Sequence, residues 1–242
     1  MNSIDSTSTP PKKGRKILLI GVISLISILL ISHFIWVGSG SNQWKLVKDE
    51  NGIKIWTIKT PGNSMIKCKA NFRVQSTLGG IIKLIEDTSS WADLGMDKKK
   101  ITMMNQIHAP GYYSAYMGFK QNMPFPFTDR EIITLMQRFQ DPQSKKIEIN
   151  VMAAPNKLPP IKGYVRIEHM HNNYTYTPLK NGEVDVDFRN EFDLGGFVPY
   201  VVKNIGAPEF LYKMMVDFKR IMKMEKYKNA KLDYIKEFNE NN

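Results

Sequence analysis

Hydrophobic positions along the chain first form one unbroken segment and then begin to alternate with polar ones. Residues 17–37 carry no permanently charged side chain, and such a segment forms a helix of about 32 Å, which can cross a bilayer. Apolar residues recur at every second position from Ile53 to Ile58 and from Ile66 to Val74, on either side of the turn at residues 61–63. The alternation predicts a hairpin with one apolar face.

Helical spacing replaces the alternation from Leu78 to Asp87, where Thr77 is a plausible N-cap and Gly79 and Gly80 weaken the helix. Alternation and turn residues then predict seven further strands, at residues 101–108, 112–119, 130–140, 146–153, 163–170, 174–179 and 184–192. The connections are short, which favours an antiparallel meander of about nine strands.

The last part of the chain returns to helical spacing, from Pro199 to about Lys236, with Gly206 and Pro208 interrupting the helix or starting a second segment. Its apolar residues form one broad stripe, at positions 211, 214, 215, 218, 221, 222 and 224. The pattern therefore predicts an α+β fold, in which a curved antiparallel sheet packs around a long C-terminal helix and one transmembrane helix precedes both.

The flanks of the apolar segment predict its orientation. Four basic residues lie in the polar segment 1–16, which we expect to be a cytoplasmic tail, and the positive-inside rule then places everything after the transmembrane helix 17–37 outside the cytoplasm, in the periplasm of a Gram-negative cell. The alternative is a cleaved signal peptide and a secreted protein, although the apolar region of a signal peptide is normally shorter. Residues 38–43, rich in Gly and Ser, are expected to be a flexible linker to a domain at 44–238.

Several short motifs in that domain share an order and spacing with one family. They are residues 124–131 (PFPFTDRE), residues 193–199 (DLGGFVP), residues 44–56 with a tryptophan at each end, Trp91, and residues 164–166 (YVR). In this order they resemble the START lipid-transfer family, with Arg130-Glu131 departing by one methylene from the family's Arg-Asp. The resemblance implies the helix-grip fold, with a lipid cavity between the sheet and the C-terminal helix.

Residues 112–119 form a predicted strand without a charged side chain, so both of its faces are expected to be covered, either by a lipid cavity or by ordinary core. The chain also has 14 methionines, whose adaptable side chains suit varied apolar ligands or fill gaps in a core. Together with the resemblance, these features make ten residues candidates for the lipid cavity: Phe72, Trp91, Tyr112, Tyr116, Met117, Met136, Met152, Arg166, Met214 and Phe218.

Charged residues of the motifs and of the tail helix are the other candidates. Arg130 and Glu131 are candidates for a structural ion pair, because an unpaired buried arginine is costly. Glu131, Asp129 and Glu168 are the possible partners of Arg130, and the alternative for Arg130 is contact with a lipid head group. Lys219, Arg220 and Lys223 lie beside the apolar stripe, where they would either contact anionic head groups or form a solvated outer face.

The sequence offers little for catalysis or metal binding. Cys68, the one cysteine, falls on the apolar phase of its strand, and His169 and His171 have no third ligand at a suitable spacing. We therefore expect a monomer that is not an enzyme, has no metal or cofactor, binds no nucleic acid, and has a membrane and one apolar lipid, such as a sterol or a phospholipid, as partners. The alternatives are an enzyme acting on an apolar small molecule in the same cavity, and a membrane-associated partner or chaperone.

Overall fold

The computed structural model describes residues 12–94, 98–196, 198 and 200–238, so most of the predicted N-terminal tail lies outside the described residues. The helices are α1 (Lys12–Gly38), α2 (Leu78–Glu86), α3 (Tyr200–Ile221) and α4 (Glu225–Lys228). The strands are β1 (Lys45–Glu50), β2 (Ile53–Ile58), β3 (Lys67–Gln75), β4 (Ile101–Ala109), β5 (Tyr112–Gln121), β6 (Arg130–Gln140), β7 (Ile147–Ala153), β8 (Val165–Arg166), β9 (Met170–Pro178) and β10 (Glu183–Phe192).

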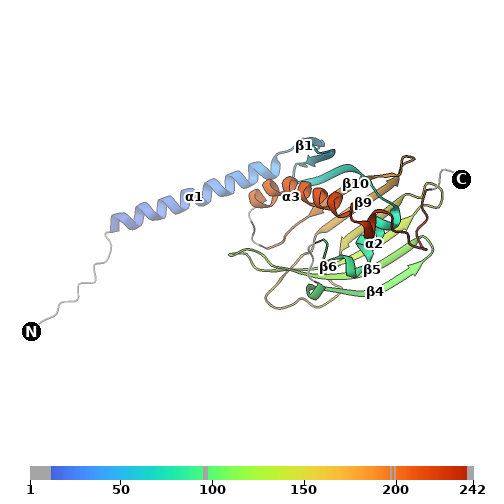
Figure 1. The fold of residues 1–242 in the computed structure, drawn as a ribbon. Helices are drawn as coiled ribbons and strands as arrows, with labels where there is room; N and C mark the ends of the chain where they lie inside the picture. Colours follow the sequence, from blue (N-terminus) through green and yellow to red (C-terminus); the bar gives the residue numbers. More distant parts are fainter. Residues whose placement is uncertain (1–11, 95–97, 197, 199, 239–242) are drawn as a thin grey trace, which may run out of the picture.

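All ten strands belong to one sheet, and α3 lies along one face of it (Figure 1). Nine of them follow the order β1-β2-β3-β10-β9-β7-β6-β5-β4 with antiparallel neighbours, while β8 pairs in parallel with β6. The predicted α+β class and antiparallel sheet are confirmed. The simple meander is wrong, because the chain leaves β3 through α2, crosses to the far edge at β4, and returns to place β10 beside β3.

The prediction and the structure differ at three elements. The strand expected at 163–170 is reduced to β8, and β9 already begins at Met170. β1 was not predicted, because its residues are almost all exposed and show no apolar alternation. The C-terminal helix runs through Pro208 without a break but ends at Ile221, after which α4 and residues 229–238 fold back against α2.

The core lies between one face of the sheet, which we call the inner face, and helices α2 and α3. On each strand every second side chain points to this face, as the period of two requires. It carries Ile53 and Ile55 of β2, Phe72 of β3, Val186 and Phe188 of β10, and they pack with Leu211 and Met215 of α3 and with Met222 just after it. One continuous hydrophobic cluster therefore connects the sheet to α3.

The opposite ends of α3 have different surroundings. At the α2 end, formed by α2, α4 and residues 229–238, backbone packs directly on backbone: a Cβ at Gly80 would overlap the carbonyl oxygen of Tyr227. Thr77 caps α2 as predicted by accepting a hydrogen bond from the Gly80 amide at 3.0 Å, and the Glu237 carboxylate accepts from the amides of Leu78 and Gly79 at 2.9 and 2.8 Å. The glycines that weaken α2 as an isolated helix thus permit this close contact.

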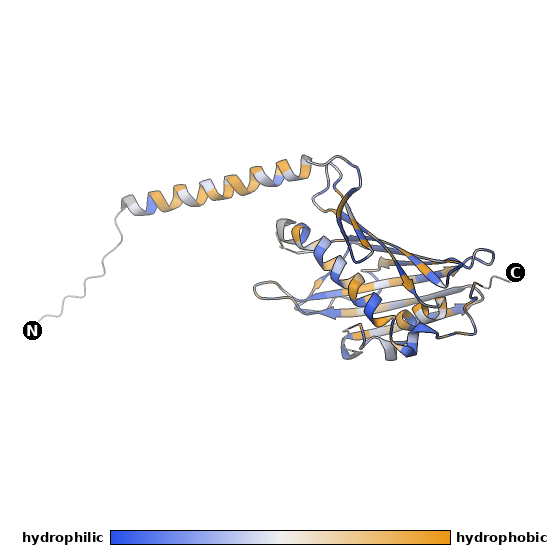
Figure 2. Ribbon diagram, turned by 45° about the horizontal axis from the view of Figure 1, so that its top comes forward, coloured by the Kyte–Doolittle hydropathy of each residue, from blue (hydrophilic) through white to orange (hydrophobic). Residues whose placement is uncertain are grey.

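The α1 end is the other end of α3, where α1 leaves the domain and runs away from the sheet (Figure 1). Within the described residues, one segment, Gly14–Gly38 of α1, is long and apolar enough to cross a membrane. Its apolar residues cover the whole circumference of the helix and are exposed (Figure 2). A helix that is apolar on all sides and exposed along most of its length is typical of a membrane span, although an N-terminal signal sequence has the same features.

Candidate functional site

Six of the ten predicted cavity residues lie together on the inner side of the sheet. Phe72, Trp91, Met117 and Met136 are buried in the hydrophobic cluster, and Met214 and Phe218 of α3 pack against it. The rings of Phe72 and Phe218 meet edge to face with centroids 5.8 Å apart, which joins the sheet to α3 directly. These residues form the surface that an apolar ligand between sheet and helix would contact.

The other four predicted cavity residues, Tyr112, Tyr116, Met152 and Arg166, lie elsewhere. In β5 the inner face is occupied by Tyr113, Ala115 and Met117, so Tyr112 and Tyr116 point to the outer face. In β7 Met152 also points outward, and its side chain is 37% exposed against 1% for Met136. Tyr116 and Met117 are adjacent in β5, so they point to opposite faces of the sheet and do not line the same cavity.

The segment between β7 and β8 explains why residues 112–119 of β5 carry no charged side chain. This segment crosses the outer face of the sheet, where the Lys157 ammonium lies 4.2 Å from the centre of the Tyr116 ring. The Ala154 amide of this segment donates to the carbonyl oxygen of Ile133 at 2.7 Å, and the Ile133 side chain is buried. The expectation that both faces of the strand are covered is confirmed, with a protein segment covering the outer one.

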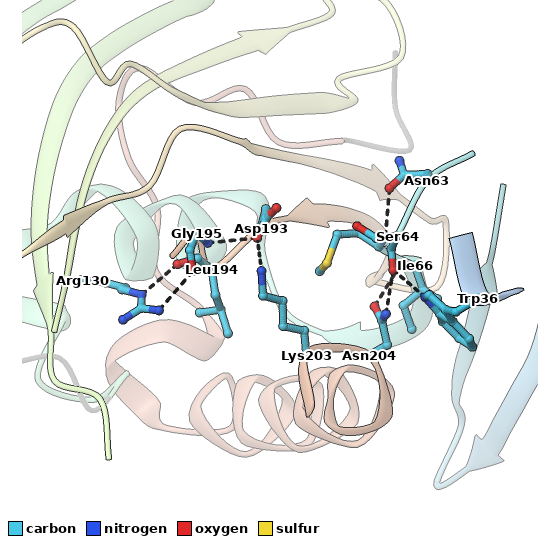
Figure 3. A network of polar contacts seen from close by, with 11 residues as sticks. Trp36, Asn63, Ser64, Ile66, Arg130, Asp193, Leu194, Gly195, Lys203 and Asn204 are labelled. Carbon is cyan, nitrogen blue, oxygen red and sulfur yellow. Dashed lines mark hydrogen bonds and ion pairs between the residues drawn. The ribbon is translucent and has the colours of Figure 1, made fainter. Parts of the chain in front are cut away.

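Arg130 and Glu131 point to opposite faces of β6, and of the two Glu131 forms the predicted structural ion pair, while Arg130 bonds to carbonyl oxygens. The Arg130 guanidinium donates to the carbonyl oxygens of Leu194 at 2.8 Å and Gly195 at 3.1 Å, and also to that of Thr128 (Figure 3). Burial lowers the pKa of Arg130, against the opposing charge of Asp129. Glu131 instead pairs with Arg166, whose Nη2 lies 2.8 Å from Oε2. Arg130 therefore joins the loop between β5 and β6 to the turn that precedes α3.

A cavity of about 310 Å³ opens beside Arg130 at the α1 end. Its lining comes from the β5–β6 loop, from Val165 of β8 and from Gly196 of the turn before α3. This volume is at the lower limit of small-molecule sites, which span about 300–1,000 Å³. The cavity therefore lies between the β5–β6 loop and the turn before α3.

Polar side chains connect the start of α3 to the surrounding loops (Figure 3). The Lys203 ammonium lies 2.6 Å from Oδ1 of Asp193, and Asn204 accepts from the Ile66 amide at 3.0 Å and donates to the Ser64 carbonyl at 2.8 Å. Burial alone would raise the pKa of Asp193, but hydrogen bonds from Lys203 and the Gly195 amide outweigh it and lower that pKa. The start of α3 is thus held by a few side-chain contacts.

A polar pair on the inner face was missed from the sequence. Asn190 of β10 donates to Oδ1 of Asn172 of β9 at 2.6 Å, next to Tyr174, whose ring stacks on Phe188 with centroids 4.3 Å apart. Burial raises the pKa of Tyr174 to about 12, so its hydroxyl stays neutral. The alternation Met170, Asn172, Tyr174, Tyr176 was the available signal. Neutral donors and acceptors of this kind suit the polar group of a mostly apolar ligand.

The basic residues proposed for membrane contact lie at the end of α3 that is remote from α1. The Lys219 ammonium donates to the carbonyl oxygen of Asn51 at 3.1 Å, Arg220 pairs with Asp217 at 3.1 Å, and Lys223 is exposed. α1 leaves the domain beside Tyr200, the first residue of α3, so α1 and these charges lie at opposite ends of α3. They fit the alternative expectation of a solvated outer face.

Catalytic or metal-binding chemistry is not evident in the described part of the chain. No group of three or more His, Cys, Asp or Glu residues there is placed to hold a metal ion. Cys68 is buried, and burial raises the pKa of its thiol to about 11, so it is not a thiolate at neutral pH. The interior as a whole is apolar, with neutral polar groups on β9 and β10 and a buried Arg138–Glu86 ion pair beside α2.

No family model matches the chain. Over 164 residues it is 23% identical to the uncharacterized protein PA1579 of Pseudomonas aeruginosa, an alignment that covers 68% of this chain and 79% of the relative. A crystal structure of a STAR-related lipid transfer protein fragment from Xanthomonas axonopodis matches with a TM-score of 0.64 and 20% identity, over 75% of this chain and 99% of the fragment. Human STARD10 matches with a TM-score of 0.60 and 14% identity, over 90% and 82% of the two chains.

Proposed function

Because the chain has a START-like, helix-grip fold, we propose that it binds one apolar lipid between the inner face of the sheet and α3. The observation that carries the proposal is the make-up of this interior, which is apolar over the length of the sheet and is covered by α3 along β2 and β3. The names of the matching structures, a bacterial lipid transfer protein among them, support the same conclusion. The sterol or phospholipid class of the ligand is left open by an interior that selects mainly by volume.

Binding in this proposal is driven by desolvation. Each methylene that leaves water for the interior contributes about 0.8 kcal/mol. Met117, Met136 and Met215 adapt to the shape of the ligand, since methionine is unbranched and polarizable. Asn172, Asn190 and the neutral Tyr174 hydroxyl would hold the polar end of the lipid.

The proposed route of entry is the α1 end. Separating the turn before α3 from the β5–β6 loop requires breaking the hydrogen bonds of the Arg130 side chain to the carbonyls of Leu194 and Gly195, and leaves the contacts of Asn204 with the β2–β3 turn in place. Lipid transfer and lipid sensing both begin with this binding step.

The proposal also includes membrane attachment. We take α1 as a retained span with its basic flank in the cytoplasm and the lipid-binding domain on the other side of the membrane. A lipid entering at the α1 end would then travel a short distance from the bilayer.

Photocrosslinking tests the binding proposal with the full chain. The protein is reconstituted into nanodiscs that contain a lipid with a diazirine near the middle of its acyl chain, and crosslinked peptides are mapped by mass spectrometry. We expect crosslinks on inner-face peptides that carry Met117, Met136 or Met215, in addition to those on α1. Crosslinks confined to α1 and to exposed loops would refute binding in the interior.

A matched pair of variants sharpens this experiment. Met136→Trp fills the interior and should abolish the inner-face crosslinks, whereas Met152→Trp adds the same bulk on the outer face one strand away and should leave them unchanged. Equal loss in both variants would indicate general unfolding, which circular dichroism of each variant detects independently.

A further inference from the structure

The connection between α1 and the sheet is fixed by contacts, although its sequence suggested a flexible linker. The Gly62 amide donates to the carbonyl of Val37 at 2.8 Å, and the Asn42 amide donates to that of Lys59 at 3.1 Å. The Lys59 ammonium donates to the carbonyls of Val37 at 3.3 Å and Ser39 at 3.0 Å, at the C-terminal end of α1. A cation there complements the helix dipole and its unsatisfied carbonyls, so the turn between β2 and β3 caps the end of α1.

Gly40 makes this contact possible. Its φ is +119°, a conformation that residues with a Cβ rarely adopt, and a Cβ there would overlap the carbonyl oxygen of Lys59. Gly38, two residues earlier, has no atom within 4 Å of the position of a Cβ. The two glycines of the same short segment therefore differ in what they permit.

The last turns of α1 also contact the start of α3. Trp36 Nε1 donates to the Ser64 carbonyl at 2.7 Å, and Asn204 of α3 donates to the same carbonyl oxygen at 2.8 Å (Figure 3). The ring of Tyr200, the first residue of α3, lies 4.8 Å from His33 and 6.2 Å from Trp36 between centroids. One carbonyl oxygen and one aromatic ring thus link α1 to α3.

These contacts set the height of α3 relative to a bilayer that α1 spans. If residues 17–37 fill the hydrocarbon core of about 30 Å, His33 is about 6 Å below Val37, the end of this span, at 1.5 Å per residue. The Tyr200 ring beside it would then lie at the depth of the upper acyl chains, next to the head groups. The β5–β6 loop projects from the domain in the direction in which α1 runs (Figures 1 and 2), and Phe125 in this loop is 98% exposed. Ile205, in the second turn of α3, is 76% exposed.

We propose that the junction of α1 with the β2–β3 turn and α3 is a rigid bracket that holds one surface of the domain against the bilayer. This bilayer-facing surface consists of the β5–β6 loop around Phe125 and the first turns of α3 around Ile205. Its partner is the head-group and upper acyl layer of the membrane from which α1 emerges. The inference rests on the proposed membrane span of α1 and adds to it a fixed orientation of the domain.

Fluorescence quenching by lipids tests the orientation on the full chain in nanodiscs of phosphatidylcholine and phosphatidylglycerol. In a Cys68→Ala background, a bimane label is placed at Phe125→Cys, Ile205→Cys, or Gln143→Cys in the β6–β7 turn at the opposite end. Spin-labelled lipids should quench the first two labels strongly and the third hardly at all. Equal quenching of all three would overturn the inference.

Two comparisons separate the ways in which the proposals can fail. A label at Ile26→Cys reports on α1 itself: if it is quenched by deep spin labels while Phe125→Cys and Ile205→Cys are not, the bracket is wrong and the membrane span stands. If Ile26→Cys is not quenched either, α1 is not in the bilayer and both fall. Gly40→Ala should remove most of the quenching at Ile205→Cys, whereas Gly38→Ala should not. Unchanged quenching in Gly40→Ala would refute the role of the junction.

Discussion

The α2 end and the α1 end of the molecule are built from different kinds of contact. At the α2 end, glycines bring backbones together, and Arg138 and Glu86 form an ion pair of 2.6 Å whose side chains are 2% and 6% exposed. At the α1 end, single side chains reach across loops, and in the Lys203–Asp193 pair the Asp193 side chain is 35% exposed. The difference indicates where the interior can open: α3 is anchored at its C-terminal side and, through Asn204, to the β2–β3 turn, and the part that can separate is the turn before α3 from the β5–β6 loop.

The largest difference between the two ends should appear when each ion pair loses its cation. Arg138→Met leaves the Glu86 carboxylate buried without its partner, which costs about 3–5 kcal/mol of unfolding free energy. Lys203→Met leaves Asp193 partly hydrated and still bonded to the Gly195 amide, so we expect a loss of about 1 kcal/mol or less. Urea unfolding of the full chain in a mild detergent, followed by near-ultraviolet circular dichroism, measures both.

A double variant is the control for this comparison. Arg138→Met combined with Glu86→Gln removes the uncompensated charge and should recover a large part of the lost stability. If the double variant is as unstable as Arg138→Met alone, the loss comes from the packing of Arg138 between the rings of Tyr113 and Tyr234. Equal losses in Arg138→Met and Lys203→Met would contradict the contrast between the ends.

Two glycines in helices should respond to alanine with opposite signs. Gly80→Ala at the α2 end forces a Cβ into the Tyr227 carbonyl, and overpacking of this kind costs about 1–3 kcal/mol. Gly206→Ala in α3 meets no atom within 4 Å and gains helix propensity, so it should stabilise by about 0.5–1 kcal/mol. Thermal unfolding of the two variants side by side gives the sign, and stabilisation by Gly80→Ala would show that α4 can move away.

The sequence predicted individual helices and strands better than it predicted which residues contact one another across the fold. The alternation in residues 66–74 and 130–140 gave β3 and β6, and Thr77 gave the cap of α2, because these signals depend on local geometry. The ion-pair partner of Glu131 is Arg166, 35 residues away. Gly79 contacts Glu237, 158 residues later in the chain, and Gly80 packs against Tyr227. Such partners are set by topology, and no local pattern specifies them.

The candidate site shows the same limit of local sequence patterns. Phe72, Met117 and Met136 were predicted on the inner face because apolar residues on one phase of a strand share a face. Tyr112 and Tyr116 were predicted beside Met117 from the chemistry of their side chains, although the period of two places them on the opposite face of the strand. Residues 154–164, which cover that outer face, show no sequence pattern that predicts their position. The contacts that hold the connection between α1 and the sheet could not be predicted from composition, because a Gly- and Ser-rich segment is flexible only where no other group binds its backbone.

The smallest expected effect is a pH dependence at the α1 end. The pKa of Asp193 is lower in the folded chain than its unfolded value of about 3.9, so the stabilisation from this carboxylate is complete above that value and is lost as the pH falls through the folded pKa. Since a third of the side chain is exposed, screening keeps the contribution below about 1 kcal/mol. Hydrogen exchange at Asn204 and Ile205, corrected for intrinsic rates, should accelerate below about pH 4 relative to Val186 in β10. Asp193→Asn should remove this acceleration; if it persists in the variant, another group controls the start of α3.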